Sequence, residues 1–295
     1  MLKKVLVPVD GSDESKHVLP YVSYLAGRFD FTVHLVGVGI GGKRRRVNQL
    51  LEEYLNEVAG NLHADNIKAE IVMLSGRPAE EILAYNESNK FDLILMTTHG
   101  RGGITRWWIG SVAEQVVCES PTPVLLIRSK AEYKSTEVQK VSFNNILVPL
   151  DGSEIGETAL PYVEELAAKT DACVTLIHVV PAHYTFDPKA GNNNGDNLNE
   201  TTRKASEEYL HGIAGLLEQR SIRAICKVGN GDPADFVVDY AGENNVDLIA
   251  MSTHGRSGVA RWVLGSVADK VLHESEKPLW LVRSSKMVIS RRKDV

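Results

Sequence analysis

The 295-residue sequence has little cysteine, only 6% aromatic residues and no long apolar run. Its three cysteines, Cys118, Cys173 and Cys226, are too few and too widely spaced for a disulfide framework or a CxxC motif. Such usage is typical of a reducing cytoplasm, where we expect the protein to be located. No run reaches the roughly 18 to 20 apolar residues that span a membrane, and the N-terminus lacks the apolar core of a signal peptide.

An excess of positive charge is also absent, because 33 lysines and arginines are set against 38 aspartates and glutamates, for a net charge of -5. We therefore expect neither nucleic acid nor an anionic membrane as a partner. The hydrophobic content of 43% is ordinary for a folded protein. At roughly 150 residues per domain, the length predicts two domains.

The two halves of the sequence repeat each other. Residues 6–12, LVPVDGS, return as residues 147–153, LVPLDGS, after 141 positions. Residues 92–101, DLILMTTHGR, return as residues 247–256, DLIAMSTHGR, after 155 positions. The constant register within each block indicates a duplication, and the second copy is 14 residues longer between the blocks.

The surplus residues of the second copy are predicted to form a loop around residues 181–199, where asparagine and glycine are abundant. A polar, charged segment over residues 129–142 is predicted to link the copies. We therefore predict one domain over residues 1–129 and a second over residues 143–285.

Short β-branched runs alternate with longer segments of helical period in each half, as in α/β domains. Strands that alternate with helices run parallel through right-handed crossovers. Each half is therefore predicted to be a doubly wound parallel five-stranded sheet with helices on both faces. The predicted strands span residues 4–9, 32–38, 69–73, 93–97 and 124–127 in the first half, and residues 145–150, 174–179, 223–228, 248–252 and 279–282 in the second.

The loops after the first and fourth predicted strands carry the candidate binding residues, since ligands of parallel sheets bind beyond the carboxyl ends of the strands. Asp10 follows the first strand and could accept hydrogen bonds from a ribose. Ser111 is predicted to cap a helix whose first amides attract an anion, and Gly100 and Gly110 would let the backbone approach a phosphate. The second half repeats these positions at Asp151, Gly255, Gly265 and Ser266. Each element alone is often only a turn or a cap, but together they predict a nucleotide site in each half.

The glycine spacing resembles that of the universal stress protein family in its tandem two-domain form, over nearly the whole chain. Nucleotide-binding members of that family carry Gly, two residues, Gly, nine residues and then Gly-Ser or Gly-Thr. Gly100 and Gly110-Ser111 match this spacing, whereas Thr97 replaces the first glycine. The second half matches with Gly255 and Gly265-Ser266, and carries Ser252 at the altered position.

This resemblance implies the strand order 3-2-1-4-5 and a stress-response regulator that binds ATP, with or without Mg²⁺. It also implies a role for each site residue: an adenine pocket, a ribose contact and a phosphate cradle. In the first half these are Pro8, Val38 and Met96, then Asp10, and then Thr97, Gly100, Gly110, Ser111 and Val112. In the second half they are Pro149, Val179 and Met251, then Asp151, and then Ser252, Gly255, Gly265, Ser266 and Val267.

Two alternatives stay open. Thr97 and Ser252 are compatible with a family member that binds no nucleotide and acts through protein interaction. A slow ATP hydrolase would need an acid, a base or a metal carboxylate beside the phosphates, and only Asp10 and Asp151 are near enough in sequence. Because no nucleophile arrangement emerges, we expect a regulator and not an enzyme.

His99 and His254 occupy matching loop positions, and we predict that they form hydrogen bonds within the turn, because no second ligand lies at metal-binding spacing. The predicted last strands, residues 124–127 and 279–282, are apolar edges that need covering, and we expect them to support a homo-oligomer. Four arginines near the glycines could contact phosphate or only solvent: Arg101, Arg106, Arg256 and Arg261.

Overall fold

The computed structural model describes residues 2–39, 45–99, 109–128, 141–181, 193–255 and 264–284. The chain divides into two compact units, residues 1–142 and 143–295. Each unit has the α/β architecture expected from the alternating pattern. None of the described helices combines the length and hydropathy that a membrane span requires.

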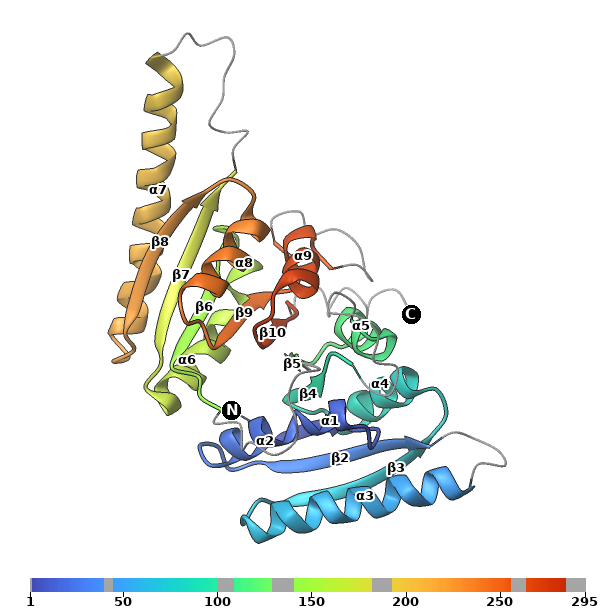
Figure 1. Ribbon diagram of the computed structural model, residues 1–295. Helices are drawn as coiled ribbons and strands as arrows, with labels where there is room; N and C mark the ends of the chain where they lie inside the picture. The colour runs from blue at the N-terminus through green and yellow to red at the C-terminus, as the bar shows by residue number, and fades with distance from the viewer. Residues whose placement is uncertain are drawn as a thin grey trace. The chain divides into compact units, whose positions relative to one another are not determined.

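The first unit is a parallel sheet in the order β3-β2-β1-β4-β5, drawn in blue to green in Figure 1. Leu6 of β1 pairs with His34 of β2 on one side and with Ile94 of β4 on the other, and the strand order reverses between β1 and β4. The strands are β1 (Lys4–Pro8), β2 (Thr32–Gly39), β3 (Ala69–Ser75), β4 (Leu93–Thr97) and β5 (Val124–Ile127). The helices are α1 (Asp13–Lys16), α2 (Leu19–Ala26), α3 (Arg45–Ala64), α4 (Pro78–Asn89) and α5 (Ser111–Glu119).

The second unit repeats this topology, with its parallel strands in the order β8-β7-β6-β9-β10. Both units therefore have the expected order 3-2-1-4-5. The strands are β6 (Asn145–Pro149), β7 (Cys173–Val180), β8 (Ala224–Asn230), β9 (Leu248–Ser252) and β10 (Leu279–Val282). A short 3₁₀ helix, η1 (Gly156–Ala159), precedes α6 (Leu160–Thr170), and α7 (Asn193–Glu218), α8 (Pro233–Glu243) and α9 (Ser266–Glu274) follow.

Helices cover both faces of each sheet. In the first unit, the crossovers through α2 and α3 run one way across the sheet and those through α4 and α5 run the other way. Right-handed crossovers therefore place the two pairs on opposite faces. Helix α3 lies along β2 and β3 (Figure 1), and α4 packs against α5. The apolar face of the first crossover, Val18, Val22 and Leu25, is buried.

The prediction of a loop at residues 181–199 is wrong from residue 193 onward, because helix α7 begins at Asn193. Asparagine has a low intrinsic helix propensity, which is why composition predicted a loop. Extending an existing helix costs far less than nucleating one, since each added residue gains a hydrogen bond. Helix α7 packs along β7 and β8, so tertiary contacts of its later turns override the local preference of its first residues.

Candidate functional site

Each unit has a pocket at the carboxyl ends of its strands, where the strand order reverses. The pocket of the first unit has a volume of about 420 Å³, and that of the second about 310 Å³. Predicted residues that line the first pocket are Pro8, Asp10, Val38, Met96, Thr97, Gly110, Ser111 and Val112; Gly100 lies outside the described residues. Those that line the second are Pro149, Asp151, Val179, Met251, Ser252, Gly255, Gly265, Ser266 and Val267.

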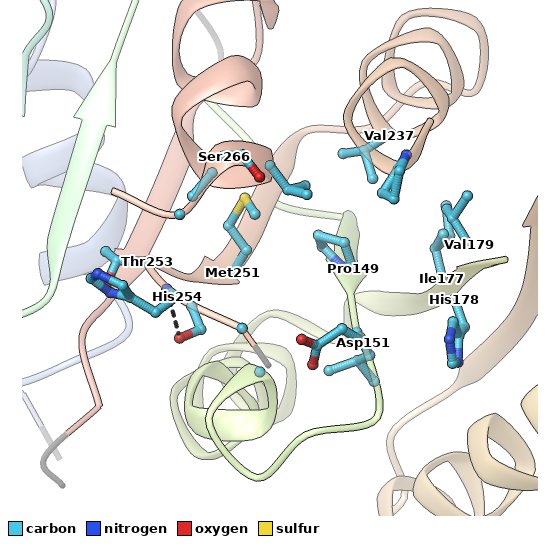
Figure 2. Close-up of a pocket in the computed structure, with 18 of the residues that line it drawn as sticks. Pro149, Asp151, Ile177, His178, Val179, Val237, Met251, Thr253, His254 and Ser266 are labelled. Carbon is cyan, nitrogen blue, oxygen red and sulfur yellow. Dashed lines mark hydrogen bonds between the residues drawn. The ribbon is translucent and has the colours of Figure 1, made fainter. Parts of the chain in front are cut away.

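Polar groups lie on two sides of an apolar interior. Figure 2 shows the second pocket, with Ser266 at the start of α9 and Asp151 on the loop after β6. Met251 and Pro149 lie between them, and Val179 forms the wall contributed by β7. A planar apolar group fits such an interior, while polar parts of the same ligand can reach either side.

The aspartate of each pocket is held by the turn that follows it. In the first unit, Asp10 Oδ1 accepts hydrogen bonds from the amide of Ser12 at 3.0 Å and from its hydroxyl at 2.5 Å. Asp151 Oδ1 accepts the same pair from Ser153, at 3.0 and 2.6 Å. The intervening Gly11 has a φ of 80°, which favours glycine. The repeated Asp-Gly-Ser sequence therefore fixes the direction of a carboxylate.

The opposite side of each pocket is the start of a helix. Gly110 precedes α5 as its N-cap residue in an extended conformation, and Gly265 does the same for α9. The prediction that Ser111 is the N-cap of this helix is therefore wrong, since Ser111 is the first residue of α5, as Ser266 is of α9. The Gly110 amide donates to the Thr98 carbonyl at 2.7 Å, and glycine avoids the tight contact of 3.1 Å that a Cβ atom would make with that oxygen.

The first turns of α5 and α9 present unpaired amides. In α5, the first intrahelical bond runs from the Glu114 amide to the Gly110 carbonyl at 3.0 Å. The amides of Ser111, Val112 and Ala113 therefore have no acceptor within the helix. Together with the positive end of the helix dipole, such amides bind anions. In α9 the first bond joins the Asp269 amide to the Gly265 carbonyl at 2.8 Å.

A sequence profile of the universal stress protein family matches residues 1–128 and 142–283. The chain belongs to the universal stress protein family. A universal stress protein of Methanocaldococcus jannaschii is 33% identical over 141 residues, which cover 43% of this chain and 83% of its own. Another, from Mycobacterium bovis, is 24% identical over 221 residues, with 75% and 70% coverage.

The fold is also that of solved universal stress proteins. The crystal structure of one from Archaeoglobus fulgidus matches with a TM-score of 0.72 at 24% identity, and covers 95% of this chain and 98% of that chain. A putative universal stress protein from Pseudomonas aeruginosa matches with a TM-score of 0.71 at 16% identity. Likenesses at these identities establish the fold.

Thr97 and Ser252, the residues that stand where the glycine spacing of the Sequence analysis expects glycine, are buried. The Thr97 hydroxyl donates to the carbonyl of His99 at 2.8 Å, within its own turn. The predicted hydrogen bonds of the histidines are present, between His99 Nδ1 and the Thr98 hydroxyl at 3.1 Å and between His254 Nδ1 and the Thr253 hydroxyl at 2.9 Å. Burial lowers the pKa of His99. Among the described residues, no cluster of three or more acidic, histidine or cysteine side chains could hold a metal ion.

Sequence reasoning missed one wall of each pocket. Pro78 and Ile82 of α4 line the first pocket, and Pro233 and Val237 of α8 line the second (Figure 2 labels Val237). The available signal was a Pro-Ala pair that follows the third strand in both copies, 155 positions apart. The four arginines proposed near phosphate, Arg101, Arg106, Arg256 and Arg261, lie outside the described residues.

Proposed function

We propose that this universal stress protein binds ATP in each of its two units and acts in the cytoplasm as a stress-response regulator, with one site in residues 1–129 and one in residues 143–285. The observation that carries the proposal is the pairing of a fixed carboxylate with a row of free amides across one apolar pocket. That pairing occurs in both units, on Asp10 and α5 and on Asp151 and α9.

Each part of the nucleotide has a chemically matched partner. The adenine packs against Pro8, Val38 and Met96 in the first unit, since these side chains make up apolar parts of the pocket. The Asp10 carboxylate accepts hydrogen bonds from the ribose hydroxyls, which are donors. The phosphates accept hydrogen bonds from the α5 amides.

The second unit has the same set of partners. Pro149, Val179 and Met251 receive the adenine, Asp151 receives the ribose, and Gly265, Ser266 and Val267 receive the phosphates. Ser252 and Gly255 also line this pocket. Mg²⁺ would enter together with the ATP phosphates, because the described residues hold no metal cluster of their own.

Thr97 does not argue against binding. Its hydroxyl is satisfied by the His99 carbonyl, so the side chain adds no unpaired polar group to the pocket. The Asp10 carboxylate is engaged by Ser12 and lies across the pocket from the α5 amides. This separation supports a binding role and not hydrolysis, for which a base beside the phosphates is needed.

The proposal is tested by denaturing the purified protein and analysing the supernatant for adenine nucleotide by chromatography. The refolded or nucleotide-stripped protein is then titrated with ATP, and with GTP as a control for the base. We expect ATP, either carried through purification or bound on addition. Absence of both would overturn the proposal in favour of a family member that acts without nucleotide. Rapid phosphate release from ATP would instead indicate an enzyme.

A further inference from the structure

A tyrosine occupies the matching position on the long helix of each unit, Tyr54 on α3 and Tyr209 on α7. In the second unit, the Tyr209 hydroxyl donates to Glu157 Oε1 at 2.8 Å. The Glu157 amide donates in turn to the Ser153 carbonyl at 3.1 Å. Because Ser153 holds the Asp151 carboxylate, the Tyr209 hydroxyl connects α7 to the turn that fixes the pocket carboxylate.

The ring of Tyr209 is held in place by its surroundings. His178 of β7 packs edge-on against it, with ring centroids 5.8 Å apart and an interplanar angle of 86°. Burial raises the pKa of Tyr209, so the phenol keeps its proton and remains a donor to Glu157. His178 also lines the pocket (Figure 2), so this group of side chains lies next to the binding site.

Two glycines leave the space that the Asp151 carboxylate occupies. A Cβ atom at Gly156 would stand 2.3 Å from Asp151 Oδ1, and one at Gly255 would stand 2.3 Å from Asp151 Oδ2. A side chain at either position would displace the carboxylate from this orientation. The orientation therefore depends on the hydrogen bonds from Ser153, on the turn that Tyr209 braces through Glu157 and on the space at the two glycines.

The first unit lacks this bracing. Lys16 stands where the second unit has Glu157, and its ammonium lies 5.7 Å from the centre of the Tyr54 ring while it pairs with Asp13. The buried Tyr54 hydroxyl makes no hydrogen bond of normal geometry with a described residue. Gly37 replaces His178, and the side chain of Leu51 fills the space.

We propose that Tyr209 is a positioning residue for ribose recognition in the second unit, where its hydrogen bond to Glu157 braces the turn that holds Asp151 in the orientation that meets the ribose. The inference rests on the proposed binding of ATP. It follows that the second unit distinguishes ribose from a sugar without hydroxyls more strongly than the first unit does.

The test isolates the second site with Gly110→Trp and compares ATP with 2′,3′-dideoxy-ATP by calorimetry. Tyr209→Phe removes the bridging hydroxyl and should reduce the preference for ATP over the dideoxy nucleotide about five- to tenfold. This factor corresponds to the free energy of one hydrogen bond. Affinity for the dideoxy nucleotide should not change. Glu157→Ala, which removes the other end of the bridge, should have the same effect, and circular dichroism checks that each variant is folded.

The matched control is Tyr54→Phe with the second site closed by Gly265→Trp. Because Tyr54 makes no such hydrogen bond, the preference of the first site for ATP over the dideoxy nucleotide should stay within about twofold of that of the parent. An unchanged preference in Tyr209→Phe, or an equal loss of affinity for both nucleotides, would overturn the positioning role. If the parent protein binds neither nucleotide, that result contradicts the proposed function of ATP binding, on which this inference depends.

Discussion

The Gly110 amide donates to the Thr98 carbonyl at 2.7 Å, and a Cβ atom at residue 110 would stand 3.1 Å from that same oxygen. The loop after β4 and the start of α5 are therefore in backbone contact. Gly265 and Thr253 repeat the relationship at 2.8 and 3.2 Å. Two stretches of backbone meet in this way at the proposed phosphate end of each pocket.

A bulky residue at either glycine should close the corresponding site. Gly110→Trp and Gly265→Trp must push the loop away from the helix, at a cost of about 1–3 kcal/mol in stability, and would fill the cradle. Calorimetric titration with ATP should show the loss of one site in each single variant and of both in the double variant. Gly60→Ala is the control, because a Cβ there meets nothing within 4 Å and binding should be unaffected.

Removal of the pocket carboxylate should weaken ATP binding. Asp10→Ala and Asp151→Ala each lose a charged acceptor for the ribose hydroxyls, an effect of about 1.5–3 kcal/mol, or roughly 10- to 150-fold in affinity. Equilibrium dialysis with labelled ATP measures it. Asp30→Ala serves as the control, because Asp30 is an exposed partner of Lys68. Wild-type affinity in both pocket variants would contradict the role given to the carboxylates.

The first unit should lose stability on mild acidification through His34. Burial lowers the pKa of His34, although Glu70, 3.6 Å away, acts in the opposite direction. The unfolded chain therefore binds the proton first as the pH falls below about 6.5, so stability present at higher pH is lost.

Urea unfolding at pH 7.5 and 5.5 tests this prediction. His34→Thr introduces the residue type that the second unit carries at the matching position, Thr175. The variant should show a smaller drop in the unfolding midpoint of the first unit between the two pH values. An equal drop in the parent and the variant would show that other groups cause the acid sensitivity.

The helix caps of α4 and α8 should respond differently to truncation. Asp232 caps α8 by accepting hydrogen bonds from the amides of Ala234 and Asp235, both at 3.0 Å. Asp232→Ala should therefore cost about 1 kcal/mol. Arg77, at the matching position before α4, has no side-chain cap bond, so Arg77→Ala should change stability by less than about 0.5 kcal/mol.

Hydrogen exchange in the first turn of each helix measures both changes. Faster exchange should be confined to α8 in Asp232→Ala. The reverse experiment is Arg77→Asp, which should slow exchange at the start of α4 by supplying the missing cap.

The strands were predictable because their residues are both β-branched and buried. Four of the predicted strands, among them Leu93–Thr97 and Leu248–Ser252, have the observed bounds, and the others differ by one or two residues at one or both ends. The central strands β4 and β9 are buried throughout and contain few polar residues, so their hydrophobic pattern is strong. Repetition of the pattern at a constant shift made the two units predictable as well.

The details of the pocket could not be obtained in the same way. Ser111 carries the side chain of a good N-cap, yet Gly110 takes that place, where a Cβ atom would make a tight contact of 3.1 Å with the Thr98 carbonyl oxygen. The hydrogen bond between Tyr209 and Glu157 could not be predicted from the sequence either, since the two residues lie 52 positions apart. Both depend on distances between elements, which periodicity does not report.

The pocket residues of the two units keep a shift of 141 positions up to Val179 and of 155 positions from Pro233 onward. The 14 extra residues of the second unit therefore lie between two groups of pocket residues and leave both groups in register. The segment between β7 and α7 lies in the part of the chain where the two units differ in length. A short reporter peptide placed there would label the second unit while leaving the composition of its pocket unaltered.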